Sequence, residues 1–406
     1  MADLRPFHAF RPPAEIVQKV AAPPYDVVTT ASARALAAGN PHSFLHVSRP
    51  EIDLPDGTDV HGDLTYAKGR ENLLALVEKK DLVRDEQAHL YVYEQTMGDH
   101  RQIGVVGCAS VDDYDQDRIK KHEKTRPDKE DDRTRHITEL GAHDEPVFLT
   151  YRAAEKVDGF VADLVTSSPT YDFTSDDGVH HRLWVVGVDA SQALAKLFAD
   201  EVGDLYVADG HHRSAAASRV HAAMKGQGGE HDRFLVVVFP HDQMFILPYN
   251  RVVKDRHGRS GEAILDALRE KLDVVSSDAA VPDVPASFGI YVGGGKWYRA
   301  TALPGTFDAD DPVARLDCQV CQDQILGPIF GITDPRRDDT IDFVGGIHGA
   351  AELERRVDEG EASVAIYLCP TKMSQVMEVS DAGKVMPPKS TWFEPKLKSG
   401  LFVHMI

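Results

Sequence analysis

Cysteine, positive charge and long apolar runs are all scarce in this chain of 406 residues. Four cysteines are too few and too scattered for a disulfide framework in a chain of this size. No run of about 18 apolar residues occurs, and the N-terminal stretch MADLRPFHAFRPP lacks the apolar segment of a signal peptide. Neither a membrane span nor secretion is therefore indicated, and we expect a cytoplasmic protein.

Basic residues are outnumbered by acidic ones, with 45 Lys and Arg against 65 Asp and Glu and a formal charge of −20. A field of this sign repels phosphate backbones unless a basic patch is concentrated locally. The sequence also lacks a helix-turn-helix signature. Nucleic acid is therefore not an expected partner, and the oligomeric state is left open.

One cysteine pair, Cys318 and Cys321, has the spacing of a metal or redox motif. A structural zinc site requires a second such pair, and a redox motif requires a thioredoxin-like surrounding. We interpret these cysteines as two ordinary helix residues and leave their function open.

The chain is long enough for two or three domains, each with its own core. Changes of pattern near residues 90 and 256 divide it into an N-terminal arm and helical extension (1–89), a core (90–255) and a C-terminal α/β domain (256–406). In the core, strand, loop, helix and strand follow one another. This order predicts the α/β (α+β) fold class.

Hydrophobic periodicity locates the principal elements. It predicts helices near 31–38 and 63–83, then a hairpin in which LYVYEQT and QIGVVGCASV flank the turn 97–100. The charged run 117–136 is interpreted as a solvated helix face. Farther on, the strands RLWVVGV and DLYVADG flank a helix near 190–198, and the helix SAAASRVHAAMKG precedes the strand FLVVVFP. The last third contains a helix near 260–272 and strands near 289–292 and 362–369.

The stretch Asp209-Gly210-His211-His212-Arg213 joins a predicted strand to a predicted helix. A glycine here permits a tight turn, and the helix start offers unpaired N–H groups and the positive end of its dipole. Arg213 can grip phosphate oxygens, both histidines can donate hydrogen bonds, and Ser214 begins a run of small side chains that allows close approach. The loop therefore suits a phosphate chain, with Asp209 holding a divalent cation or taking a proton.

Two other interpretations of the loop stay open. In one, Asp209 caps the helix and the histidines only satisfy neighbouring backbone groups. In the other, His211, His212 and Asp209 hold a metal ion, although adjacent histidines point in different directions and do not easily serve one ion.

The same loop resembles the phosphate-binding motif of the free-serine kinases, which have a ParB/sulfiredoxin-like fold and phosphorylate L-serine from a nucleotide. More broadly, the chain is identified as a member of a domain-of-unknown-function family that shares the stretches ADGHHR, KKHEKTRPDKEDDR and MPPKSTWF. The resemblance implies a ParB/sulfiredoxin-like nucleotide-binding core with an N-terminal extension and a separate C-terminal domain. It implies ADP or ATP as the phosphoryl donor, with Mg²⁺.

Two further segments of the chain resemble segments of the free-serine kinases that contain functional residues. Lys121-His122-Glu123 resembles the segment in which those kinases carry a catalytic glutamate, so the resemblance implies that Glu123 accepts the proton of the substrate hydroxyl. The C-terminal pattern that ends in Pro388-Lys389-Ser390-Thr391 also resembles theirs. The cation of Lys389 and the hydroxyls of Ser390 and Thr391 suit the carboxylate of a serine-like substrate, and a β-turn is the alternative.

The departures from the kinase pattern are a long N-terminal segment without counterpart and an insertion over 133–202. They leave the acceptor undetermined. The leading hypothesis is a phosphotransferase that acts on free L-serine or a similar hydroxy amino acid. The alternatives are a non-catalytic nucleotide-binding regulator and a ParB-like nuclease or DNA-binding switch, which would need a basic surface.

Overall fold

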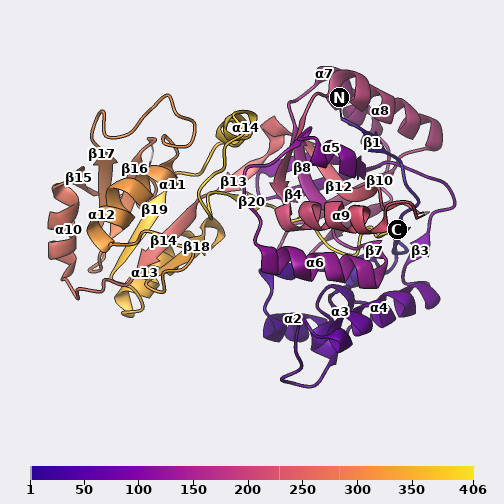
Figure 1. Ribbon diagram of the computed structural model, residues 1–406, viewed down its shortest axis with the longest axis horizontal. Helices are drawn as coiled ribbons and strands as arrows, with labels where there is room; N and C mark the ends of the chain where they lie inside the picture. Colours follow the sequence, from indigo (N-terminus) through magenta and orange to yellow (C-terminus); the bar gives the residue numbers. More distant parts are fainter. Residues whose placement is uncertain (1, 228, 283) are drawn as a thin grey trace. The chain divides into compact units, whose positions relative to one another are not determined.

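A computed structural model describes residues 2–227, 229–282 and 284–406 (Figure 1). The chain forms two compact units: unit 1 comprises the residues up to Met244 together with Pro395–Ile406, and unit 2 comprises Phe245–Glu394. Both mix strands and helices, which confirms the predicted α/β class. No helix in the described part of the chain has the length and apolar character needed to cross a membrane.

The helices of unit 1 are α1 Val17–Val20, η1 Tyr25–Val27, α2 Thr30–Ala37, α3 Leu45–Ser48, η2 Pro50–Asp53, α4 Asp63–Glu78, α5 Val111–Asp115, α6 Pro127–Leu140, α7 Glu155–Leu164, α8 Val188–Glu201, α9 His211–Met224 and η3 His241–Gln243. Its strands are β1 Leu4–Arg5, β2 Phe10–Arg11, β3 Val83–Arg84, β4 Tyr91–Met97, β5 His100–Ser110, β6 Ile119–Lys120, β7 Ala142–His143, β8 Val147–Tyr151, β9 Tyr171–Thr174, β10 His180–Val185, β11 Leu205–Asp209, β12 Arg233–Pro240 and β21 His404–Met405.

A large mixed sheet organises unit 1, with strand order β6-β11-β8-β12-β5-β4-β10-β9 and with β1 added beside β5. The predicted hairpin is confirmed as β4 and β5, which pair from Met97 and His100 inward. Strand β11 runs parallel to β6 and antiparallel to β8, and its register with β8 shifts between Val207 and Asp209. This irregularity lies where the chain leaves the sheet for α9.

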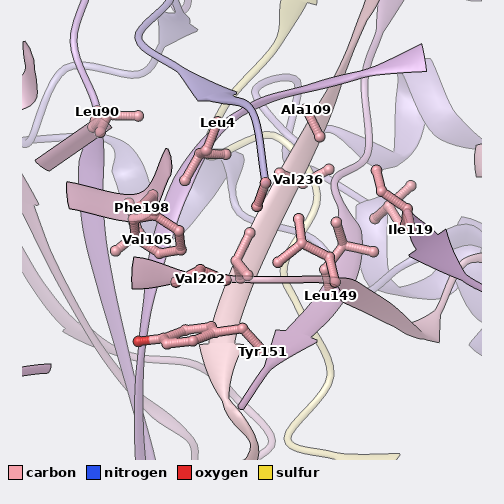
Figure 2. Close-up of a cluster of buried hydrophobic side chains, with 14 of the residues drawn as sticks. Leu4, Leu90, Val105, Ala109, Ile119, Leu149, Tyr151, Phe198, Val202 and Val236 are labelled. Carbon is pink, nitrogen blue, oxygen red and sulfur yellow. The ribbon is translucent and has the colours of Figure 1, made fainter. Parts of the chain in front are cut away.

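The two faces of this sheet are both buried. One face carries residues such as Leu149, Val105 and Val236, and α8 packs Phe198 into the same cluster (Figure 2). The alternate residues point the other way, as the two-residue period of a strand requires. On that second face the Tyr91 ring contacts Phe7 of the N-terminal arm at 5.5 Å and Phe402 of the C-terminal segment at 4.9 Å between ring centroids.

The N-terminal extension belongs to unit 1 and does not form a domain of its own. Strand β1 pairs with β5, and α4 packs against α6, so both ends of the extension are tied to the sheet unit. This division differs from the three domains expected from sequence: no compact unit ends near residue 90, and the border expected near residue 256 lies at residue 244.

The charged run 117–136 is not only a solvated helix face, which corrects the sequence-based interpretation. It contains β6 and most of α6, and α6 lies between α4 on one side and α9 on the other (Figure 1). Asp132, Arg133 and His136 of α6 are buried: Asp132 accepts a hydrogen bond from Tyr66 of α4, Arg133 lies over the Tyr25 ring, and His136 pairs with Asp144. Helix α6 begins with Pro127 and ends at Leu140, and the following Gly141 caps it with a left-handed φ of 67°.

Unit 2 contains a six-stranded sheet of order β15-β17-β16-β19-β14-β18 and a two-stranded ribbon of β13 and β20. Its strands are β13 Phe245–Leu247, β14 Tyr249–Val253, β15 Leu272–Ser277, β16 Ser287–Tyr291, β17 Trp297–Ala302, β18 Ile341–Gly345, β19 Val364–Leu368 and β20 Trp392–Glu394. Its helices are α10 Gly261–Arg269, α11 Asp317–Cys321, η4 Gln322–Leu326, α12 Gly327–Phe330, η5 Gly346–His348, α13 Gly349–Asp358 and α14 Met373–Asp381. Cys318 and Cys321 lie in α11, as predicted, and both are buried.

Candidate functional site

The turn from β11 into α9 has the glycine and the helix start that the sequence predicted, whereas Arg213 is turned inward. Gly210 has φ of 96°, a left-handed conformation that glycine adopts readily. A Cβ atom at this position would lie 3.0 Å from Nε of Arg213, so a larger residue would also force the Arg213 side chain to shift. Within the described residues, the amides of His211, His212 and Arg213 make no hydrogen bond, and the positive end of the helix dipole lies here.

Asp209 lies at the carboxyl end of β11 and forms an ion pair that sequence reasoning missed. Its Oδ2 accepts a hydrogen bond of 2.8 Å from Nζ of Lys396, which comes from the C-terminal segment of unit 1. Burial alone would raise the pKa of Asp209, but the cations of Lys396 and Arg213 outweigh it and hold the pKa below its ordinary value. Asp209 is therefore a carboxylate with a fixed counter-ion at neutral pH.

Arg213 lies beneath the turn, with an exposed side-chain fraction of 11%. Its Nη1 donates to the carbonyl of Pro146 at 2.6 Å, and Nη1 and Nη2 lie 3.9 Å from Glu145 and Asp209 respectively. The guanidinium thus stabilises the loop from its buried side. Ser214 is likewise buried, and its hydroxyl donates to the Gly210 carbonyl at 3.2 Å.

Three imidazoles lie beside the turn and are neutral at pH 7. Burial lowers the pKa of His122 to about 4 and lowers those of His211 and His212 as well. The His122 and His211 rings meet edge to face with centroids 4.4 Å apart. Nδ1 of His122 and Nε2 of His211 are buried polar atoms without a hydrogen-bond partner among the residues described. Nε2 of His212 accepts from the Arg126 amide at 3.1 Å, which leaves its Nδ1 as the donor.

The segment of residues 121–126, which contains Glu123, runs beside the turn. Strands β6 and β11 are parallel, with Leu205 opposite Ile119, so the segments that follow them leave the sheet at the same edge. The His122–His211 contact and the Arg126–His212 hydrogen bond fix the two segments together. The side chain of Glu123 is exposed. The structure therefore brings Glu123 and the 209–213 loop to one edge of one sheet.

Acidic neighbours pair with most of the basic residues that follow Glu123. Arg126 pairs with Asp128 at 2.8 Å, and Arg133 pairs with Asp132 at 2.8 Å. The ammonium of Lys129 forms no ion pair within the described ranges, and its charge acts on His212. Lys129 thus supplies a positive charge that no ion pair of the described residues holds, although its charge also acts on Asp128.

Glu145 is a second site residue that the sequence did not indicate. It is buried, its Oε1 accepts from Ser399 Oγ at 2.8 Å and from the Tyr25 amide at 3.0 Å, and it lies beside Arg213. Burial raises the pKa of Glu145 to about 7, although Arg213 opposes this. Asp26 of the N-terminal arm also acts on Arg213. The arm and the C-terminal segment therefore both reach the back of the loop.

The predicted substrate-binding residues Lys389, Ser390 and Thr391 belong to unit 2, whereas the loop belongs to unit 1. Ser390 is buried, its hydroxyl donates to the Pro387 carbonyl at 2.6 Å, and the Cys318 thiol lies 3.0 Å away. Lys389 has φ of 58° and is exposed. These contacts hold a tight turn.

No cluster of three or more His, Cys, Asp or Glu side chains suited to a metal ion occurs in the part of the chain that the structure describes. This finding does not support the His/His/Asp interpretation of the loop. The Oδ1 atom of Asp209 makes no hydrogen bond with any described residue. One carboxylate is compatible with Mg²⁺ only when phosphate oxygens and water complete the shell.

The fold and this turn define the protein as an α/β protein with a candidate anion-binding site at a helix N-terminus. The chain belongs to the family described as "Protein of unknown function (DUF1015)", whose model matches residues 4–319. No curated protein matches the chain.

Solved structures similar to the chain include a free serine kinase in complex with AMP, which is 15% identical over 71% of this chain and 86% of that one, with a TM-score of 0.35. C-terminally truncated SbnI from Staphylococcus aureus is 12% identical over 74% of this chain and 87% of that one, with a TM-score of 0.38. A conserved hypothetical protein from Pyrococcus furiosus is 15% identical over 74% and 95%, with a TM-score of 0.36. Likenesses of this strength do not establish a shared fold, and the ParB/sulfiredoxin-like core stays a prediction.

Proposed function

We propose that the protein is a nucleotide-dependent kinase that phosphorylates the hydroxyl of a small molecule such as free L-serine. The observation that carries this proposal is that β6 and β11 bring Glu123 and the start of α9 to the same edge of the sheet. Phosphoryl transfer requires a protein chiefly to position the reactants and to stabilise the charge of the moving group. A proton acceptor beside free helix amides meets that requirement.

The turn would hold the terminal phosphates of ADP or ATP. The amides of His211, His212 and Arg213 point out of the helix start, and Nδ1–H of His212 adds a donor. Because the imidazoles are neutral, they bind the phosphates by hydrogen bonds rather than by charge. Positive charge comes from Lys396 once a ligand competes for it. Arg213 positions the loop from beneath.

Asp209 would hold Mg²⁺ through its Oδ1, and the ion would supply charge neutralisation on the transferred group. In the transfer, the acceptor oxygen forms a bond to the terminal phosphorus while the bond to the nucleotide's bridging oxygen breaks. Glu123 would take the proton that the acceptor hydroxyl loses. A general base of this kind contributes about 10²–10⁴-fold to the rate.

The Lys396–Asp209 ion pair favours a second candidate, a non-catalytic nucleotide-binding regulator. An ammonium at 2.8 Å neutralises the carboxylate that a kinase would use for Mg²⁺. A regulator would bind the nucleotide by the same amides and release or recruit a partner without turnover.

Phosphorus NMR of purified protein with Mg²⁺, L-serine and either ADP or ATP separates these candidates. The kinase should form O-phosphoserine, and Glu123→Gln should slow the reaction by about 10²–10⁴-fold while nucleotide affinity is retained. Asp209→Asn should lower both the rate of phosphorylation and the affinity for the nucleotide. Glu139→Gln, at an exposed position of α6, is the matched control. Nucleotide binding without transfer to any hydroxylated acceptor would leave the regulator, and absence of nucleotide binding would exclude both.

A further inference from the structure

A second pocket lies in unit 1, between the N-terminal extension and α6. Its volume is about 170 Å³, and its lining comes from η1, η2, the start of α4 and one side of α6. An engineered cavity of about 150 Å³ holds benzene, so a pocket of this size takes a molecule of roughly six to eight non-hydrogen atoms. No residue of the 209–213 loop lines this pocket.

The two acidic side chains of the lining already have donors. Oε1 of Glu51 accepts from Thr30 Oγ1 at 3.1 Å and lies 2.8 Å from Nε of Arg49. Asp132 accepts from Tyr66 Oη at 2.7 Å and from Nε of Arg133 at 2.9 Å. Both carboxylates are therefore already bound by side chains of the protein, and we do not expect either to bind a ligand.

The cations of the lining are not balanced. Arg49, Lys129 and Arg133 contribute three positive charges, while Glu51 and Asp132 contribute two negative ones, which leaves one positive charge. Arg49 pairs with Glu51, and Arg133 pairs with Asp132 and lies over the Tyr25 ring at 3.9 Å. The remaining charge is that of Lys129, whose ammonium has no ion pair among the residues that are described.

We propose that this pocket binds a small molecule that carries a single carboxylate, with Lys129 as the group that pairs with it. One unbalanced positive charge matches one carboxylate, whereas a phosphate group carries about −1.5 to −2 at pH 7. A charge-assisted hydrogen bond in a partly enclosed pocket is of the stronger kind. The inference is independent of the proposed kinase activity, because it uses neither Glu123 nor the loop.

Calorimetric titration of the full chain with L-lactate tests the proposal. Its neutral analogue L-lactamide has nearly the same shape and no charge. We expect saturable binding of L-lactate, and no measurable binding of L-lactamide. Lys129→Met should weaken L-lactate binding by about tenfold to a hundredfold, since hydrogen bonds to charged groups contribute about 1.5–3 kcal/mol. Lys68→Met, on α4 and paired with Glu71, is the matched control and should bind L-lactate like the native chain.

Three outcomes with L-lactate and L-lactamide would overturn the proposal. They are no saturable L-lactate binding, equal binding of lactate and lactamide, and an equal effect of the Lys129 and Lys68 substitutions. Inorganic phosphate is the third ligand titrated, and a loss of phosphate affinity in Lys129→Met larger than the loss of L-lactate affinity would overturn the assignment to a carboxylate. Lys129 is partly exposed, so its variant is expected to fold, and thermal unfolding of each variant checks this.

Discussion

At the residue scale, Glu145 is the least expected group of the candidate site. Its carboxyl is buried beside Arg213, and its Oε2 has no hydrogen-bond partner among described residues. Burial disfavours the charged form, which is why its pKa lies above that of an exposed glutamate. A buried acid that keeps its proton near neutral pH links the stability of the loop to pH.

We predict that this acid makes the folded protein less stable as pH rises from about 4.3, the ordinary glutamate pKa, to about 7. Below this window both states hold the proton; within it the folded state keeps the proton that the unfolded chain has lost, so the free energy of unfolding falls. In Glu145→Gln the free energy of unfolding should fall less steeply between these pH values, by up to about 1.4 kcal/mol per pH unit. Urea unfolding at a series of pH values measures it.

Glu155→Gln, at an exposed position of α7, serves as the control and should keep the native slope. An unchanged slope in Glu145→Gln would show that Glu145 is ionised throughout this window in the folded protein.

The sequence predicted the site where the residues are contiguous. Asp209, Gly210 and the start of α9 are found as expected, because a strand, a glycine and a helix start form locally. Lys396 and Glu145 could not be predicted, since their contacts with Asp209 and Arg213 join segments far apart in the sequence. The inward position of Arg213 also depends on burial that only the fold creates.

At the element scale, the packing of α6 against α9 holds the Glu123 segment beside the loop. Ala216 of α9 is fully buried and packs with Ile137 of α6 and with Val220. The small side chain lets the two helices approach closely. The sequence predicted α9 and a solvated helix face in the 117–136 run, but it did not predict the burial of α6, because the charges of that run hide its buried side.

We expect Ala216→Leu to destabilise the protein by about 1–3 kcal/mol, because a well-packed core must shift to admit a larger side chain. Chemical denaturation measures the change. Ala222→Leu on the exposed side of the same helix should change the free energy of unfolding by less than about 0.5 kcal/mol. Similar effects of both substitutions would contradict the packing argument.

At the scale of the whole molecule, unit 2 is inserted into unit 1. The chain enters unit 2 along β13 and leaves it along β20, and Phe245 pairs with Glu394 in the antiparallel ribbon. Facing residues of such a pair have Cα atoms about 4.5–5.5 Å apart. The sequence did not reveal this insertion, because no composition change marks residue 244 or residue 395.

Replacing residues 245–394 with a short glycine linker from Met244 to Pro395 should therefore leave a unit 1 that unfolds cooperatively. It retains the loop and Lys396, so we expect nucleotide affinity within about tenfold of the full chain. Calorimetric unfolding measures the cooperativity, and nucleotide titration measures the affinity. A shortened chain without a cooperative transition would contradict the division into units.

The salt bridge between Lys396 and Asp209 ties the loop to a residue that is translated after unit 2. A nascent chain on the ribosome thus carries the turn without its counter-ion until unit 2 has emerged. Completion of the site is accordingly a late event in biogenesis, so a partly made chain holds an incomplete site.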